Sequence, residues 1–151
     1  RRYAHAELVL RLNARQDELP LDRLEADVVR RVNEYRLSMA APPLEVEPRL
    51  VACARGHSAE MRELDYLAHE SPTAGRRTMG ERALLAGYPS DAVGECIYRG
   101  RKEDGEEVFL YWYRSPVHHR LLLREDFRQI GAGRAGLYWT VNFGFLHALE
   151  Y

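Results

Sequence analysis

The C-terminal part of the chain carries the feature that most restricts its fold, an alternation of apolar with smaller or more polar residues. The apolar positions are Leu137, Trp139, Val141, Phe143 and Phe145. A period of two residues predicts a β-strand with one buried face. Residues 129–133 predict a partner strand, with the chain turning near Gly136. The sequence therefore predicts an antiparallel hairpin close to the end of the chain.

The chain before this hairpin shows helical spacing instead. Asp22 and Glu25 form a capping-box pattern that begins a helix ending near Met39, and Pro48 opens a second helix that includes Leu64. Shorter helices are predicted at 78–87, from 106 and from 115, and a short strand is predicted at 94–98. Because most helices precede the strands, this order predicts an α+β layered domain rather than a parallel βαβ sheet.

The composition indicates one globular domain, with 151 residues of which 46% are hydrophobic and 30% charged. We expect residues 1–22 to form a helical N-terminal extension and residues 23–151 to form the domain. The 22 basic and 23 acidic side chains nearly cancel, so no nucleic-acid partner is predicted. No apolar run approaches the roughly 20 residues that span a bilayer, so no membrane span is predicted either.

Three polar residues are candidates for chemistry, although no common catalytic motif is present. His69 lies in a loop after an apolar helix, Glu95 lies near the start of a strand, and His118 is the third residue of a short helix. Backbone N–H groups at a helix start keep an imidazole neutral, and a neutral imidazole can bind a metal ion. His57 lies on an apolar helix face and is interpreted as a core residue.

An ordered series of short blocks covers residues 24–145 and resembles the CAP superfamily of cysteine-rich secretory, antigen 5 and pathogenesis-related proteins, in particular its compact bacterial branch. The blocks are VNEYR (32–36), HSAEM (57–61), YLAHESP (66–72), RALLAGY (82–88), GECI (94–97), WYRSPVH (112–118), IGAG (130–133) and YWTVNFG (138–144). The resemblance implies an α-β-α sandwich, in which a small antiparallel sheet lies between helical layers beside a surface cleft.

The resemblance also implies a cleft with two histidines and two acidic residues that can hold a divalent metal. The histidines fall on His69 and on His118 rather than His119, and the first glutamate falls on Glu95. The second glutamate position holds Ser115, and neither of the weighed substitutes, Glu70 and Glu107, is adopted. Residues expected to line the cleft are Glu70, Ser71 and Ser115.

Two interpretations of Glu95 stay open. As a third ligand beside two imidazoles, it would complete a zinc site with an open water position. As a carboxylate that only orients one histidine, it would leave two ligands and weak metal binding, which we favour. A hydrogen-bonded cluster without metal is a further alternative. A serine nucleophile, Ser71 or Ser115, with a histidine base is disfavoured because Ser115 is explained as a helix N-cap.

The two cysteines, Cys53 and Cys96, allow one disulfide. A helix packed on the strand would bring them within reach, and the mainly secreted family favours the bond. Two buried free thiols are the alternative.

We therefore expect a secreted or cell-surface, non-enzymatic binding module for a lipid, glycan or protein partner, with a divalent cation such as zinc in its cleft. The chain opens on Arg1, and a signal peptide is expected to have been removed upstream. A zinc-dependent hydrolase using His69, Glu95 and His118 is the first alternative. A structural module of a larger extracellular protein is the second.

Overall fold

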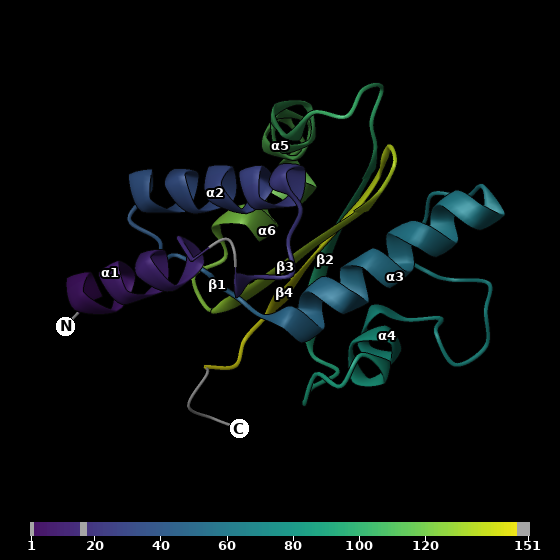
Figure 1. The fold of residues 1–151 in the computed structure, drawn as a ribbon, viewed down its shortest axis with the longest axis horizontal. Coiled ribbons are helices and arrows are strands. Elements are labelled where there is room, and N and C mark those ends of the chain that lie inside the picture. Colours follow the sequence, from purple (N-terminus) through teal and green to yellow (C-terminus); the bar gives the residue numbers. More distant parts are fainter. Residues whose placement is uncertain (1, 16–17, 148–151) are drawn as a thin grey trace.

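A four-stranded sheet lies between two groups of helices in the computed structural model, which describes residues 2–15 and 18–147 (Figure 1). The strands are β1 (Glu45–Val46), β2 (Val93–Arg99), β3 (Gln129–Ala135) and β4 (Tyr138–Gly144). One face is covered by α3 (Pro48–Leu64) and α4 (Met79–Leu85), the other by α2 (Arg23–Ser38), α5 (Gly105–Arg114) and α6 (Pro116–Leu123). The predicted α-β-α sandwich is confirmed.

The sheet has the order β1-β3-β4-β2, so β2 is its last strand. The predicted hairpin is formed by β3 and β4, and the turn at Gly136 has a φ of +58° that suits glycine. The sheet is not wholly antiparallel, because β1 pairs with β3 in parallel. β1 leaves no signal in the sequence, since two residues are too few to show an alternation.

Local signals explain where the helices begin and end. Asp22 and Glu25 cap α2 reciprocally, and Thr78 and Glu81 do the same for α4. α3 begins with Pro48 at its first position and spans the predicted residues.

The segment expected to be an extension contains α1 (Arg2–Asn13), which packs beside β1. Val9 is buried, and the Asn13 side-chain amide bonds the backbone of Leu44 and Val46 at 2.8 and 3.0 Å. The division into residues 1–22 and 23–151 stays a prediction.

The two cysteines lie on opposite sides of the sheet, so the predicted disulfide is wrong. Cys96 packs with Trp112 in the core between the sheet and α2, α5 and α6. Cys53 packs with Ala83 and Tyr88 on the side of α3 and α4, and both thiols are free and buried. Neighbouring strand residues point to opposite faces, and it is Glu95, not Cys96, that faces α3.

The contact between α3 and β3 brings two backbones together without intervening side chains. A Cβ added at Gly131 would lie 2.2 Å from the carbonyl carbon of Leu50, and one at Gly133 would lie 2.2 Å from the amide nitrogen of Arg55. Ser58 Oγ on α3 lies 2.9 Å from the carbonyl oxygen of Gly133. Glycine at these positions therefore sets how closely α3 approaches the sheet.

We predict that Gly133→Ala destabilises the domain by about 3 kcal/mol or more, because its methyl group meets backbone that has no room to move. Gly75→Ala is the control, since Gly75 has open space and only a positive φ of 79°, which costs an L-residue about 1 kcal/mol. Urea unfolding measures both variants. Equal losses of stability in the two variants would contradict the steric explanation.

We also predict that both cysteines react with iodoacetamide only after unfolding, without prior reduction. Burial raises the pKa of Cys53 to about 12 and raises that of Cys96 as well, so neither thiol ionises in the folded protein at neutral pH. Intact mass spectrometry counts the added groups. A requirement for reductant would show that the disulfide exists.

Candidate functional site

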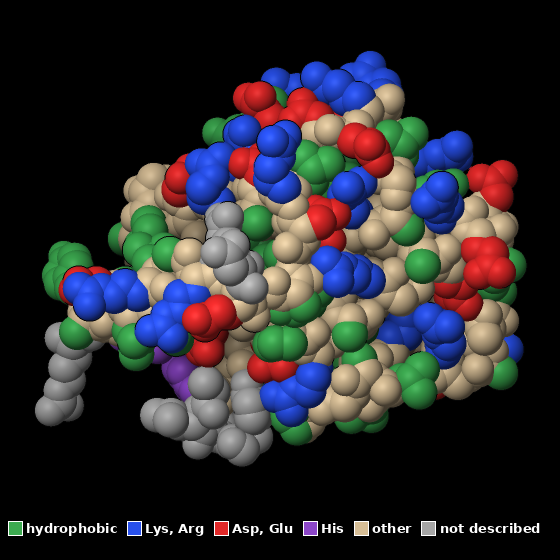
Figure 2. Space-filling model, viewed as in Figure 1, with side chains coloured by type: hydrophobic (Ala, Val, Ile, Leu, Met, Phe, Trp, Pro, Cys, Tyr) green, Lys and Arg blue, Asp and Glu red, His purple; other side chains and the backbone are tan. Residues whose placement is uncertain are grey.

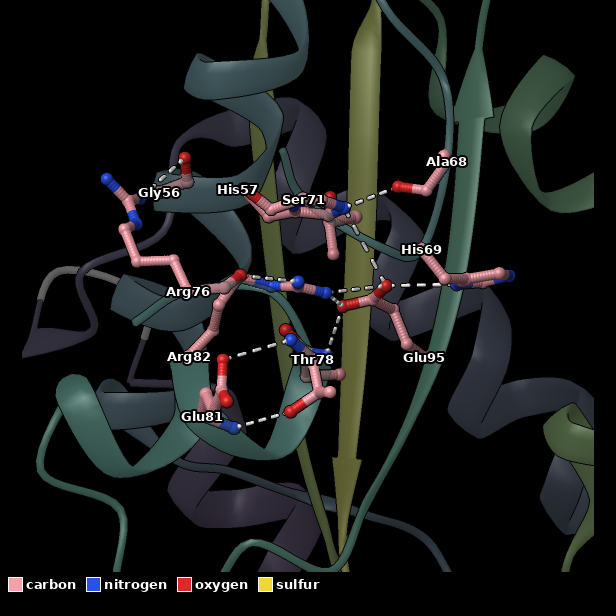
Figure 3. Close-up of polar contacts among 12 residues, drawn as sticks. Gly56, His57, Ala68, His69, Ser71, Arg76, Thr78, Glu81, Arg82 and Glu95 are labelled. Carbon is pink, nitrogen blue, oxygen red and sulfur yellow. Dashed lines mark hydrogen bonds and ion pairs between the residues drawn. The ribbon is translucent and has the colours of Figure 1, made fainter. Parts of the chain in front are cut away.

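Glu95 is the centre of a buried polar cluster between β2 and the α3–α4 layer (Figure 3). Its side chain is fully buried, and Arg82 of α4 donates from one guanidinium nitrogen to both carboxylate oxygens at 2.9 and 3.1 Å. His69 Nδ1 lies 2.9 Å from Oε1, and the side-chain amide of Asn142 donates to Oε2 at 3.0 Å. Both carboxylate oxygens are therefore engaged within the protein.

Glu95 is ionised in this setting. Burial alone would raise its pKa, but the hydrogen bond from His69 and the charge of Arg82 bring the pKa below its ordinary value. An ionised carboxylate only accepts hydrogen bonds, so His69 Nδ1 carries the proton toward it. In neutral His69, the Nε2 lone pair is then free, and the side chain is 48% exposed.

His57 is the core residue that the helical pattern predicted. It is fully buried, and its Nε2 donates to the carbonyl of Ala68 at 2.8 Å. Burial lowers its pKa, and the charge of Arg82 adds to this effect although Glu95 opposes it. Neutral His57 therefore fixes the backbone next to His69.

A second carboxylate, Glu60 of α3, fastens the loop that carries His69. It accepts hydrogen bonds from the hydroxyls of Tyr66 at 2.8 Å, Ser71 at 2.7 Å and Thr73. These three bonds lower the pKa of Glu60 to about 2, against the effect of burial. The loop is thus tied to α3 on both sides of His69.

His118 lies at the start of α6, where its Nδ1 is 2.8 Å from the hydroxyl of Ser115. Burial lowers the pKa of His118 below its ordinary value, so its imidazole is neutral at pH 7. Among the described residues, His118 contacts Ser115 and the ring of Tyr111, and it has no direct contact with His69 or Glu95. Ser115 precedes α6 as predicted, but its side chain makes no capping bond to the backbone.

The other residues considered for the cleft differ in their burial and in their contacts. Glu70 is exposed, whereas Ser71 is buried and bonded to Glu60. Glu107, one of the weighed substitutes for the missing glutamate, binds the loop before α5. Ser115 is half-buried beside His118.

The donor set does not fit a three-ligand zinc site. Among the described residues, no group of three or more His, Cys, Asp and Glu side chains is arranged to hold a metal ion. Glu95 is neutralised by Arg82, which leaves His69 and His118 as the two available imidazoles. Two imidazoles fit only a weak site, and the metal role of these residues stays a prediction.

The roles of Arg82, Asn142 and Glu60 are not evident from the sequence. Arg82 is only 3% exposed and lies 13 residues from its partner, Glu95. The one signal in the sequence was the carboxylate of Glu95, because a charged side chain on a buried strand requires a partner of opposite charge. Nothing in the sequence indicated which arginine supplies it.

By its sandwich, the chain has the fold of an SCP domain. It belongs to the cysteine-rich secretory protein (CAP) family, whose model matches residues 29–143. The predicted resemblance is confirmed.

The relatives are bacterial proteins. The chain is 32% identical to YkwD of Bacillus subtilis over 121 residues, which cover 79% of this chain and 46% of YkwD. An extracellular protein containing an SCP domain from Bacillus anthracis superposes with a TM-score of 0.75 at 27% identity, covering 82% of this chain and 44% of that one. An outer surface protein of Borrelia burgdorferi shares the fold, with a TM-score of 0.70 at 20% identity over 80% of this chain and 90% of that one.

The chain spans less than half the length of YkwD and of the Bacillus anthracis protein. Within the described residues, none of the helices has the length and apolar character needed to span a bilayer.

We predict that Glu60→Gln destabilises the domain by about 2 kcal/mol or more at pH 7. A carboxyl group with a pKa of about 2 when folded and 4.5 ordinarily favours folding by about 3 kcal/mol when ionised. This contribution is complete above about pH 5 and is lost as the pH falls from about 4.5 toward 2. The difference between the E60Q variant and the wild type should therefore shrink between pH 7 and pH 3.

Urea unfolding at both pH values measures this difference. Glu63→Gln is the matched control, because Glu63 is exposed on the same helix and should change stability little at either pH. If E60Q lowers the free energy of unfolding by the same amount at pH 7 and pH 3, the charge of Glu60 is not the cause of the loss.

Proposed function

We propose that the chain is an extracellular binding module whose cleft, between His69 and His118, binds a divalent metal ion weakly and catalyses no reaction. The engagement of Glu95 by Arg82, His69 and Asn142 carries this proposal. A catalytic zinc ion has three protein ligands and an open position. With Glu95 held by Arg82, only two imidazoles are offered.

The same contact argues against Glu95 as a general base. A base near neutral pH has a raised pKa, whereas the pKa of Glu95 is lowered. His69 is oriented by Glu95 as in a catalytic dyad, but its free Nε2 lacks a bonded nucleophile among the described residues. The hydroxyl of Ser115 contacts His118 instead, and no described carboxylate orients His118.

The relatives support an extracellular location for the chain, and they do not indicate which ligand it binds. One neighbour is an extracellular protein with an SCP domain, and another is an outer surface protein. By analogy we assign this chain to the same setting. The hydrolase and the structural-module alternatives have no comparable contact in their favour.

Calorimetric titration with zinc tests the metal site. We expect a dissociation constant of roughly 10 µM or weaker, because two ligands provide much less than the 10–16 kcal/mol of complete structural zinc sites. His118→Ala and His69→Ala should each abolish the binding. His119→Ala is the matched control, since both of its ring nitrogens are already bonded, to Tyr35 and to Tyr113.

Two outcomes would contradict the proposal. Zinc retained stoichiometrically through dialysis, together with ester or phosphoester hydrolysis lost in His118→Ala, would favour the hydrolase. Zinc binding that persists in both single variants would place the metal elsewhere.

A further inference from the structure

A groove of about 460 Å³ lies between α5 and the loop before it, and we call it the α5 groove. Its lining comprises Tyr98, Arg101, Lys102, Asp104, Glu106, Glu107, Leu110, Tyr111, Arg114 and Ser115. Ligand sites in proteins typically measure roughly 300–1,000 Å³, so the space suits a small molecule or part of a chain.

The loop wall of the groove is fastened to α5. The Glu107 carboxylate accepts hydrogen bonds from the backbone N–H groups of Arg101 and Lys102, each at 3.2 Å. Asp104 accepts a bond from the backbone of Glu106 at the start of the helix. The groove is therefore shaped before any ligand arrives, which lowers the entropic penalty of binding.

The charges that line the groove cancel. Three side chains are basic and three acidic, and Figure 2 shows the two signs mixed over α5 and the adjoining loop. Arg101 pairs with Glu107, and Lys102 with Asp104. Among the described residues, the side chains of Arg114 and Glu106 have no partner. The groove thus offers hydrogen-bond donors and acceptors but no net field for an ion.

Two of its lining residues, Tyr98 and Tyr111, form an aromatic pair. The rings of Tyr98 and Tyr111 stack with their centroids 4.2 Å apart and an interplanar angle of 20°, and Tyr111 is 46% exposed. Leu110 is the one aliphatic residue of the lining. A flat sugar ring combines one apolar face with many hydroxyls, so it matches a lining that holds both aromatic rings and hydrogen-bonding side chains.

The groove leads to the histidine cleft. Ser115 belongs to its lining and contacts His118, and the rings of Tyr111 and His118 have centroids 5.8 Å apart. A ligand seated on Tyr111 and extending past Ser115 would reach the cleft. A chain of linked rings meets this geometry better than a single ring.

We propose that the α5 groove binds an uncharged oligosaccharide, with one sugar ring on Tyr111 and its hydroxyls bonded to Arg114 and Glu106. This rests on the proposed function, because it names the ligand of that binding module. Zinc binding and sugar binding are measured separately, so either proposal can fail alone.

The test is an NMR titration of the protein with chitotetraose and with cellotetraose, which are both uncharged. We expect saturable shifts of groove residues with at least one of them. Tyr111→Ala should weaken binding about tenfold, and Arg114→Ala should weaken it too. Tyr111→Phe keeps the ring and should retain binding, while Tyr3→Ala, which alters a 92% exposed tyrosine on α1, should change nothing.

Titrations with the anionic sugar tetragalacturonic acid, and with added salt, test whether the charge of the ligand contributes to binding in the groove. We expect the anionic sugar to bind no tighter than the neutral ones, and salt to leave the neutral affinity unchanged. No saturable binding of either uncharged sugar would overturn the proposal. So would binding that Tyr111→Ala leaves intact, or tighter, salt-sensitive binding of the anionic sugar.

Measuring zinc binding beside sugar binding distinguishes a failure of the proposed function from a failure of the sugar-binding proposal. His118→Ala that loses zinc but keeps sugar binding would support both proposals as distinct parts of one surface. Zinc binding without sugar binding would retain the proposed function and remove the ligand assigned here.

Discussion

The close contact between α3 and β3 is the constraint on which the rest of the structure depends. Gly131 and Gly133 let the helix backbone rest directly on the strand backbone. α3 in turn carries His57 and Glu60, which hold the loop of His69 through a backbone carbonyl and three hydroxyls. The position of an exposed imidazole thus follows from the absence of side chains at two buried positions.

Charge compensation decides what this site can do. A buried carboxylate is tolerated only when it is paired and hydrogen-bonded, and Arg82 provides the pairing for Glu95. The pairing that makes Glu95 stable also removes it from the set of free ligands and bases. The neighbouring groove follows a similar pattern, because its charged residues mostly bind one another and leave a surface without net charge.

Local signals made much of the fold predictable. The capping box of Asp22 and Glu25, Pro48 at the start of α3, and the alternation along β4 each depend on residues close in sequence. The pairing of β1 with β3 and the packing of α1 beside β1 depend on distant residues, and the sequence showed neither. For the site, the resemblance pointed to His69, Glu95 and His118, whereas Arg82 and Glu60 act through contacts across elements. The disulfide was predicted from proximity of helix and strand, and side-chain direction excluded it.

The opposite orientations of Glu95 and Cys96 have a consequence for how β2 tolerates change. A shift of its pairing with β4 by one residue would move the carboxylate into the apolar core beside Trp112 and present a thiol to Arg82. The carboxylate of Glu95 and the guanidinium of Arg82 would then each be buried without its partner. The register of the strand is therefore fixed by electrostatics as well as by packing, and single-residue insertions or deletions within β2 should be far less tolerated than substitutions on its surface.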